Sequence, residues 1–182
     1  VTLVEIEERI LKRVAAKETS DYIRALHISN GVKIKEAVGL DKLEIVDDKV
    51  LSASLTDGLD INVDFVIVGI GITPNTELAE GANLKINNGI FINDKCQTSI
   101  SNIYAAGDCT SFEYKDTLVR LESVGNAIDQ ANIVAQNIMK QNTNYIPKPW
   151  FWSDQYDLKL QIAGLNTGYE DVVVRKGENK QV

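Results

Sequence analysis

The chain has little of what several classes of protein require. Its 182 residues include one histidine and two cysteines, and the cysteines, Cys96 and Cys109, form no C-x-x-C pair. So few ligating side chains disfavour a disulfide scaffold and a metal site, and two isolated thiols favour a reducing compartment such as the cytoplasm. No apolar run is long enough to span a membrane and no signal peptide is visible, so no membrane interaction is expected.

Positive charge is also scarce. Lys and Arg number 19 against 26 Asp and Glu, which gives a net charge of -7, and the acids are spread along the chain. Phosphate binding requires clustered Lys and Arg, so nucleic acid is not expected as a partner. Hydrophobic residues, in contrast, make up 44% of the chain, which is enough for a core in one domain or in parts of two.

Both ends of the chain resemble the interior of a domain. The sequence opens on the apolar strand "VTLV" without a Met, and "DVVVRKGENKQV" (171–182) is typical of a strand and turn that should continue. These ends predict a fragment of a longer protein, although a processed or trimmed chain would have the same appearance.

The first part of the chain predicts a strand–helix–strand crossover. Residues 1–4 resemble a parallel strand buried on both faces, and a helical stretch with apolar residues over 10–15 follows. A second helix is expected to begin near Thr19 or Ser20, to stop at Asn30-Gly31 and to lead into the next strand. Two antiparallel strands then flank the turn at Asp47-Asp48.

The rest of the chain predicts buried strands and one clear helix. "DFVIVGIG" (64–71) is the strongest buried strand, and 103–106 is a further one. A helix capped by Ser123 follows, and 142–149 has the composition of a linker. Further strands are expected over 149–157, 158–165 and 171–176. The pattern indicates an α/β assembly of more than one domain.

"NIYAAGDC" (102–109) places a carboxylate just beyond a predicted strand. Ligands of open α/β sheets bind beyond the carboxyl ends of the strands, so Asp108 is a candidate acceptor for a hydroxyl group. Ala105, Ala106 and Gly107 leave room for the chain of a cofactor. The alternative is that Asp108 caps a local turn.

Two further candidates occur earlier in the chain. Glu5 follows the first strand, where an acid can bond the ribose hydroxyls of NAD, or it is a solvated glutamate of an acidic run. In "GIGITPN" (69–75), Gly69 and Gly71 flank Ile70 and permit close approach by a ligand or another chain segment. A proline replaces the third glycine of a dinucleotide fingerprint, so a structural crossover between domains remains the alternative.

"RLESVGNAIDQA" (120–131) places Glu122 just before a helix that starts at Val124. Free N–H groups at such a helix start suit an electron-rich acceptor, including a flavin that becomes anionic on reduction, although an ordinary capped helix would show the same pattern.

"PWFWSDQYD" (149–157) concentrates aromatic residues, among them Trp152. Aromatic side chains can cover a flat ring system, or they can be part of the core.

Taken in order, "GIGITPN", "TSISNIYAAGDC", "RLESVGNAIDQA" and "PWFWSDQYD" resemble the later part of NAD-dependent ferredoxin reductases. These are FAD flavoproteins of the putidaredoxin reductase and biphenyl dioxygenase reductase type. The resemblance implies α/β, Rossmann-like FAD/NAD(P)-binding domains, present in part. Residues 1–72 would be the later part of the NAD-binding domain and 73–148 the returning part of the FAD-binding domain. Residues 149–182 would start an α+β C-terminal domain.

The resemblance also implies roles in binding FAD. Asp108 would hold a ribityl hydroxyl of FAD as the cofactor passes over Gly107. The backbone N–H of Val124 would meet the pyrimidine edge of the flavin. Trp152 would lie beside the isoalloxazine and nicotinamide rings.

For NAD, the resemblance implies that Glu122 contacts the region of the nicotinamide carboxamide. Glu5 would bind the adenosine ribose, which favours NADH over NADPH. Gly69, Ile70 and Gly71 would form a wall of the NAD site.

The implied activity is hydride transfer from NADH to FAD, followed by single-electron transfer to a small iron–sulfur ferredoxin of an oxygenase system. No catalytic acid or base is expected, because the cofactor carries the chemistry. The glycine fingerprints would lie upstream, so the isolated chain is expected to be inactive. Relatives often carry a basic residue where this chain has Asn132, so the ferredoxin-docking surface is expected to differ. A flavin disulfide reductase and a non-catalytic NAD/FAD signalling flavoprotein are the alternatives.

Overall fold

The computed structural model describes residues 1–175 and residue 177. The chain forms two compact units, which we call the first and the second unit. The first comprises Val1–Ile70 together with the chain from Asn166, and the second comprises Gly71–Leu165. Among the described residues, no helix has both the length and the apolar character needed to cross a membrane.

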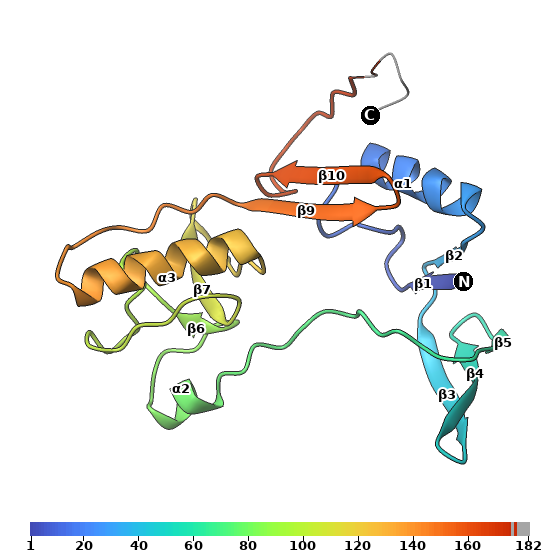
Figure 1. Cartoon of the computed structure of the whole chain (residues 1–182), viewed down its shortest axis with the longest axis horizontal. Coiled ribbons are helices and arrows are strands. Elements are labelled where there is room, and N and C mark those ends of the chain that lie inside the picture. Colours follow the sequence, from blue (N-terminus) through green and yellow to red (C-terminus); the bar gives the residue numbers. More distant parts are fainter. Residues whose placement is uncertain (176, 178–182) are drawn as a thin grey trace. The chain divides into compact units, whose positions relative to one another are not determined.

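The first unit contains the predicted crossover. Strands β1 (Thr2–Glu5) and β2 (Lys33–Glu36) pair in parallel, and helix α1 (Lys17–Ser29) connects them (Figure 1). Asn30 is the C-cap of the helix, and Gly31 follows with φ +80°, as the Asn-Gly stop signal predicts. The side chains of β1 are only half-buried in the part of the chain that the structure describes. The prediction of a strand buried on both faces was therefore wrong.

The predicted helix over residues 10–15 was also wrong, because this segment forms turns. Ile10 bonds to other elements: its N–H donates to Glu36 Oε1 at 2.8 Å, and its carbonyl accepts from Ser20 Oγ at 2.7 Å. Helix α1 starts at Lys17, earlier than predicted, and Ser20 is a buried residue inside the helix rather than its cap.

An ion pair joins α1 to β2. The Arg24 guanidinium donates from Nε and Nη2 to the two carboxylate oxygens of Glu36, at 2.8 and 2.7 Å. These bonds hold the pKa of Glu36 below its usual value. Because both partners are mostly buried, the pair fixes the helix against the end of the strand.

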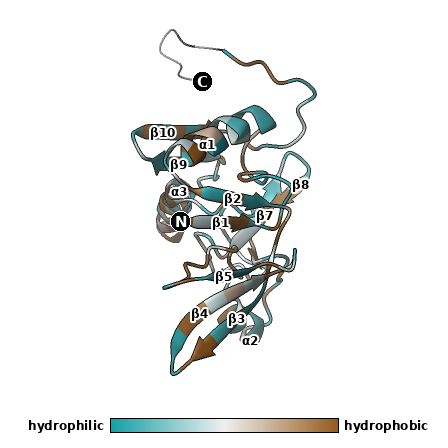
Figure 2. Cartoon of the chain, turned by 90° about the vertical axis from the view of Figure 1, so that its right-hand side faces the viewer, coloured by the Kyte–Doolittle hydropathy of each residue, from teal (hydrophilic) through white to brown (hydrophobic). Residues whose placement is uncertain are grey.

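A three-stranded antiparallel meander follows, with β3 (Leu40–Val46), β4 (Lys49–Leu55) and β5 (Asp60–Asn62). The turn at Asp47 and Asp48 has positive φ at both residues, which suits a tight hairpin and confirms the prediction. Figure 2 shows hydrophobic segments along the β3–β4 hairpin, where Ile45 and Leu51 are exposed.

"DFVIVGIG" (64–71) does not form the buried strand that its composition predicts. It runs as an irregular connection between β5 and helix α2 (Glu77–Gly81), and Ile67 is 86% exposed (Figure 1). The physical reason is that a strand needs a neighbour to bond its backbone, and no strand in the described chain pairs with this run.

The second unit contains a small sheet, a long helix and a hairpin. Strand β7 (Thr110–Tyr114) pairs in parallel with β6 (Ile90–Phe91) and antiparallel with β8 (Thr117–Val119). Helix α3 (Val124–Ile138) matches its prediction, including the Ser123 cap. Strands β9 (Trp150–Gln155) and β10 (Leu158–Ala163) form the expected hairpin. Residues 171–175 form no strand, since no neighbour pairs with them, and Lys176 lies outside the described residues.

The core of the second unit is built from Ile92, Cys96, Phe112, Leu121 and Tyr145. Burial raises the pKa of Cys96 to about 11. The Tyr145 ring meets Phe112 edge-on with centroids 5.4 Å apart, and its hydroxyl donates to Asn126 of α3. Residues 142–149 form no helix or strand, as their linker composition predicts, but Tyr145 anchors this segment in the core.

Gly89 is expected to tolerate no side chain. An added Cβ would lie 2.7 Å from the Cys109 carbonyl oxygen, and φ is +127°. We expect Gly89→Ala to lower the free energy of unfolding by more than the roughly 1–2 kcal/mol of a strained φ alone, as measured from urea denaturation. Gly164→Ala is the matched control, because Gly164 has φ +95° but no atom lies within 4 Å of an added Cβ. Equal losses in the two variants would contradict the steric explanation.

Candidate functional site

A turn over Gly107–Thr110 presents Asp108 to solvent. The Thr110 N–H donates to the Gly107 carbonyl at 3.0 Å, which encloses Asp108 and Cys109 in the turn. The expected strand over 103–106 was wrong: this segment makes one isolated bridge, Gln97 to Tyr104, because no described strand pairs with it further. Asp108 therefore lies just before the amino end of β7.

Gly107 places this turn against helix α3. Its φ of +92° favours glycine, and a Cβ at this position would lie 3.7 Å from Ala127 Cβ. Its N–H donates to the side-chain oxygen of Gln130 at 2.7 Å. The Gln130 side chain thus ties the turn to α3, and Gly107 is the residue of the turn that lies against the helix.

The start of α3 has backbone N–H groups available for a ligand. Ser123 has extended backbone, and its Oγ accepts from the Asn126 N–H at 3.3 Å. Val124 and Gly125 precede the first N–H that can bond within the helix. Val124 is 59% exposed, and the space beside Gly125 is open. An electron-rich group can approach these donors and the positive end of the helix dipole.

Arg120 connects Glu122 to the Asp108 turn. Its Nη2 lies 2.9 Å from Glu122 Oε1, and its Nη1 donates to the Asp108 carbonyl at 3.3 Å. Both side chains of the ion pair are mostly buried, with 10% of Arg120 and 20% of Glu122 exposed. Sequence reasoning missed Arg120, although the Arg-x-Glu spacing in an extended segment places both side chains on one face.

Trp152 lies on the exposed face of β9 together with Trp150. Their rings stack with centroids 5.0 Å apart and planes at 29°. Phe151 points the other way and packs against the core of the second unit. Because side chains alternate between the two faces of a strand, the aromatic residues of β9 lie on opposite faces. The two stacked tryptophans offer a flat surface that can cover a ring.

Apart from Glu122, the predicted NAD residues lie elsewhere in the chain. Glu5 is the last residue of β1, and its carboxylate accepts from the Glu7 N–H at 3.0 Å. It lies at the carboxyl end of two paired parallel strands, where nucleotides bind in such sheets. Gly69 and Ile70 belong to the exposed run after β5, and Ile70 is 92% exposed, while Gly71 has φ +99°.

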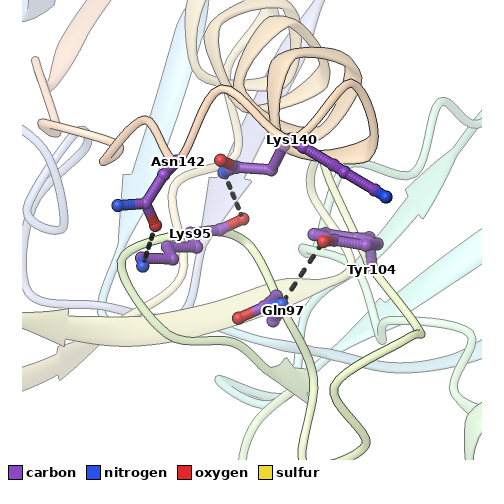
Figure 3. A pocket seen from close by; sticks show the side chains of 6 residues that line it. Lys95, Gln97, Tyr104, Lys140 and Asn142 are labelled. Atoms are coloured by element: carbon purple, nitrogen blue, oxygen red, sulfur yellow. Dashed lines mark hydrogen bonds between the residues drawn. The ribbon is translucent and has the colours of Figure 1, made fainter.

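A separate cavity of about 260 Å³ lies at the carboxyl end of α3 (Figure 3). Its lining is polar: Lys95, Gln97, Tyr104, Asn137, Lys140 and Asn142. Lys95 donates to Asn142, and Gln97 donates to the Tyr104 hydroxyl at 3.3 Å. None of the predicted site residues lines this cavity, so it is distinct from the Asp108 turn.

The second unit fits part of an FAD site. Asp108 can accept a hydroxyl, Val124 and Gly125 can donate backbone N–H groups, and neither Gly107 nor Gly125 carries a side chain that would obstruct a ligand. The chain contains no G-x-G-x-x-G loop for a pyrophosphate. These features suit the binding of a nucleotide cofactor with an anionic or electron-rich group.

The chain belongs to the pyridine nucleotide-disulphide oxidoreductase family, whose model matches residues 1–131. Residues 150–182 match the family described as reductase C-terminal. These matches confirm the Rossmann-like FAD/NAD(P)-binding fold class. FAD and a nicotinamide nucleotide, the predicted cofactors, are the cofactors of this family.

The similar proteins include several reductases of known name. Rhodocoxin reductase of Rhodococcus erythropolis is 40% identical over 177 residues, which cover 96% of this chain and 42% of the relative. Putidaredoxin reductase of Pseudomonas putida is 41% identical over 179 residues, with the same coverage. The covalent putidaredoxin reductase–putidaredoxin complex matches with a TM-score of 0.92 and 40% identity, over 100% of this chain and 44% of that one. The chain thus spans less than half the length of these relatives, and the resemblance inferred from the motifs is confirmed.

The Arg120–Glu122 pair generates a stability prediction. We expect Arg120→Met to lower the free energy of unfolding by about 3 kcal/mol, because it leaves the Glu122 charge largely buried without this partner. Adding Glu122→Gln should restore part of the loss by removing that charge. Urea denaturation of the variants measures both effects.

Lys159→Met is the matched control for Arg120→Met. Lys159 lies 3.7 Å from Asp154 with both side chains exposed, so its loss should cost less than about 1 kcal/mol. A similar loss in Lys159→Met and Arg120→Met would contradict a special role for the buried pair.

Proposed function

We propose that this chain is part of an FAD-dependent reductase that oxidises NADH and passes electrons singly to a small iron–sulfur ferredoxin of an oxygenase system. The observation that carries the proposal is the Asp108 turn held beside the open start of α3, in a chain similar to putidaredoxin reductase. When bound, FAD supplies hydride acceptance and one-electron chemistry. The residues of this chain bind and orient it.

Each FAD-binding residue has a distinct task in this proposal. Asp108 accepts a hydroxyl of the ribityl chain, and Gly107 lets that chain pass close to the backbone. The Val124 N–H donates to the pyrimidine edge of the flavin, where the helix dipole stabilises negative charge. Trp152, stacked on Trp150, covers the ring system and excludes water from it.

The NAD residues set the choice of nucleotide. Glu5 bonds the adenosine ribose, and its negative charge repels the additional phosphate of NADPH. Gly69, Ile70 and Gly71 form a wall of the NAD site, and Glu122, oriented by Arg120, contacts the nicotinamide carboxamide. Hydride transfer requires no side-chain acid or base.

The same proposal covers the domain organisation, the protein partner and the cellular compartment. Residues 1–72 belong to the NAD-binding domain, 73–148 to the FAD-binding domain and 149–182 to the C-terminal domain. The partner is a ferredoxin, and it docks on a surface that has Asn132 in place of a basic residue. Both cysteines are free thiols, which supports a reducing compartment, the cytoplasm.

Electron transfer by the full-length protein tests the function. We expect it to contain stoichiometric FAD, to bleach its flavin absorbance with NADH and to reduce a ferredoxin. The isolated 182-residue chain should retain no FAD, because it carries only part of the site. Turnover with a disulfide in place of ferredoxin would support a disulfide reductase, and absence of turnover with either acceptor would support a signalling flavoprotein. Either result would refute the proposal.

A change of nucleotide preference tests Glu5. In the full-length protein, Glu5→Arg should weaken NADH and improve NADPH as electron donor, shifting the ratio of their kcat/KM values by about tenfold or more, because a like charge is replaced by an opposite one near the phosphate. Glu8→Arg is the matched control in the same acidic run. An unchanged preference in Glu5→Arg would remove Glu5 from the site.

A further inference from the structure

Gln130 makes a buried contact that the proposed roles do not use. Its side chain is fully buried in α3. Its Oε1 accepts from the Gly107 N–H at 2.7 Å and lies 2.9 Å from Thr110 Oγ1, which also lies 2.8 Å from the Gly107 carbonyl. One amide oxygen therefore reaches both ends of the turn that encloses Asp108.

The orientation of this amide has a cost. A backbone N–H can only donate, so the oxygen of Gln130 must face Gly107 and the nitrogen must face away. Gln130 Nε2 is buried and has no hydrogen-bond partner in the described part of the chain. An unpaired buried donor is destabilising, and a methionine would fill similar space without one. What the glutamine provides in return is an acceptor for Gly107 and Thr110.

The turn has a second support of a different kind. Arg120 Nη1 donates to the Asp108 carbonyl at 3.3 Å, a longer bond than the one from Gly107 to Gln130. Arg120 comes from the extended segment before α3, whereas Gln130 comes from the helix itself. Gln130 thus fixes the ends of the turn directly to the helix whose start offers Val124 to the same ligand.

We propose that Gln130 is a positioning residue that holds the Gly107–Thr110 turn in its binding shape, so that Asp108 is oriented for the ribityl chain before FAD arrives. The inference rests on the proposed function, in which Asp108 binds FAD. A preorganised turn binds more tightly because less conformational freedom is lost on binding. Without the Gln130 acceptor, the Gly107 N–H loses this hydrogen-bond partner, the Thr110 hydroxyl keeps only the Gly107 carbonyl as acceptor, and the turn is no longer bonded to the helix.

The test is FAD affinity in the full-length protein, with the dissociation constant measured by flavin fluorescence on titrating apoprotein. Gln130→Met should weaken FAD binding by about tenfold, which corresponds to the loss of about one hydrogen bond's net contribution. Thr110→Val keeps the shape of a 1% exposed side chain but removes its hydroxyl, and should weaken binding in the same direction. Thr110→Val also serves if Gln130→Met fails to fold.

Asn137→Leu is the matched control. Asn137 is likewise a buried amide of α3, but it bonds Lys95 and Thr143 at the opposite end of the helix. It should lower Tm while leaving FAD affinity within about twofold, far below the tenfold change of about 1.4 kcal/mol. Equal loss of FAD affinity in Asn137→Leu and Gln130→Met would reduce Gln130 to a stability residue and overturn the inference.

A double-mutant cycle with Asp108 separates positioning from stability. Asp108→Asn should weaken FAD binding strongly in the wild-type background and less in Gln130→Met, because Asp108 is no longer held in place. Additive effects would overturn the inference. A wild-type protein that binds no FAD would instead refute the proposed function, whereas FAD affinity unchanged by Gln130→Met and Thr110→Val would refute this inference alone.

Discussion

The hydrogen bond from the Gly107 amide to the buried side chain of Gln130 ties the Asp108 turn to helix α3. It requires a glycine with positive φ on one side and a buried acceptor on the other. The first N–H groups of the same helix, at Val124 and Gly125, have no acceptor within the helix, so this contact connects the Asp108 turn to the element that carries those donors. We propose that the second unit binds one face of a flavin, and this role depends on the connection between the Asp108 turn and α3.

Arginine–glutamate pairs act as a second constraint in both units. Arg24 joins helix α1 to the end of β2 through Glu36, and Arg120 joins Glu122 to the Asp108 turn. Each pair is mostly buried, so its geometry matters more than that of an exposed pair. In the first unit the ion pair stabilises the crossover, whereas in the second it orients residues that we propose to face a cofactor.

Features with local causes could be predicted from the sequence. Ser123 caps α3 and Asn30-Gly31 ends α1, since a cap or a stop depends on a few adjacent residues. The predictions of features that need a distant neighbour were wrong. Residues 64–71 and 103–106 have the composition of strands, but backbone pairing decides whether a strand forms, and the described chain does not supply their partners.

The candidate site shows the same division. The sequence by itself determined the family, because the motifs around Asp108, Val124 and Trp152 occur in a specific order, and the comparisons confirmed that family. Only the tertiary structure decided which groups support those motifs. Gln130 and Arg120 reach the Asp108 turn from other segments of the chain, and hydrogen bonds between distant segments leave no periodicity in the sequence.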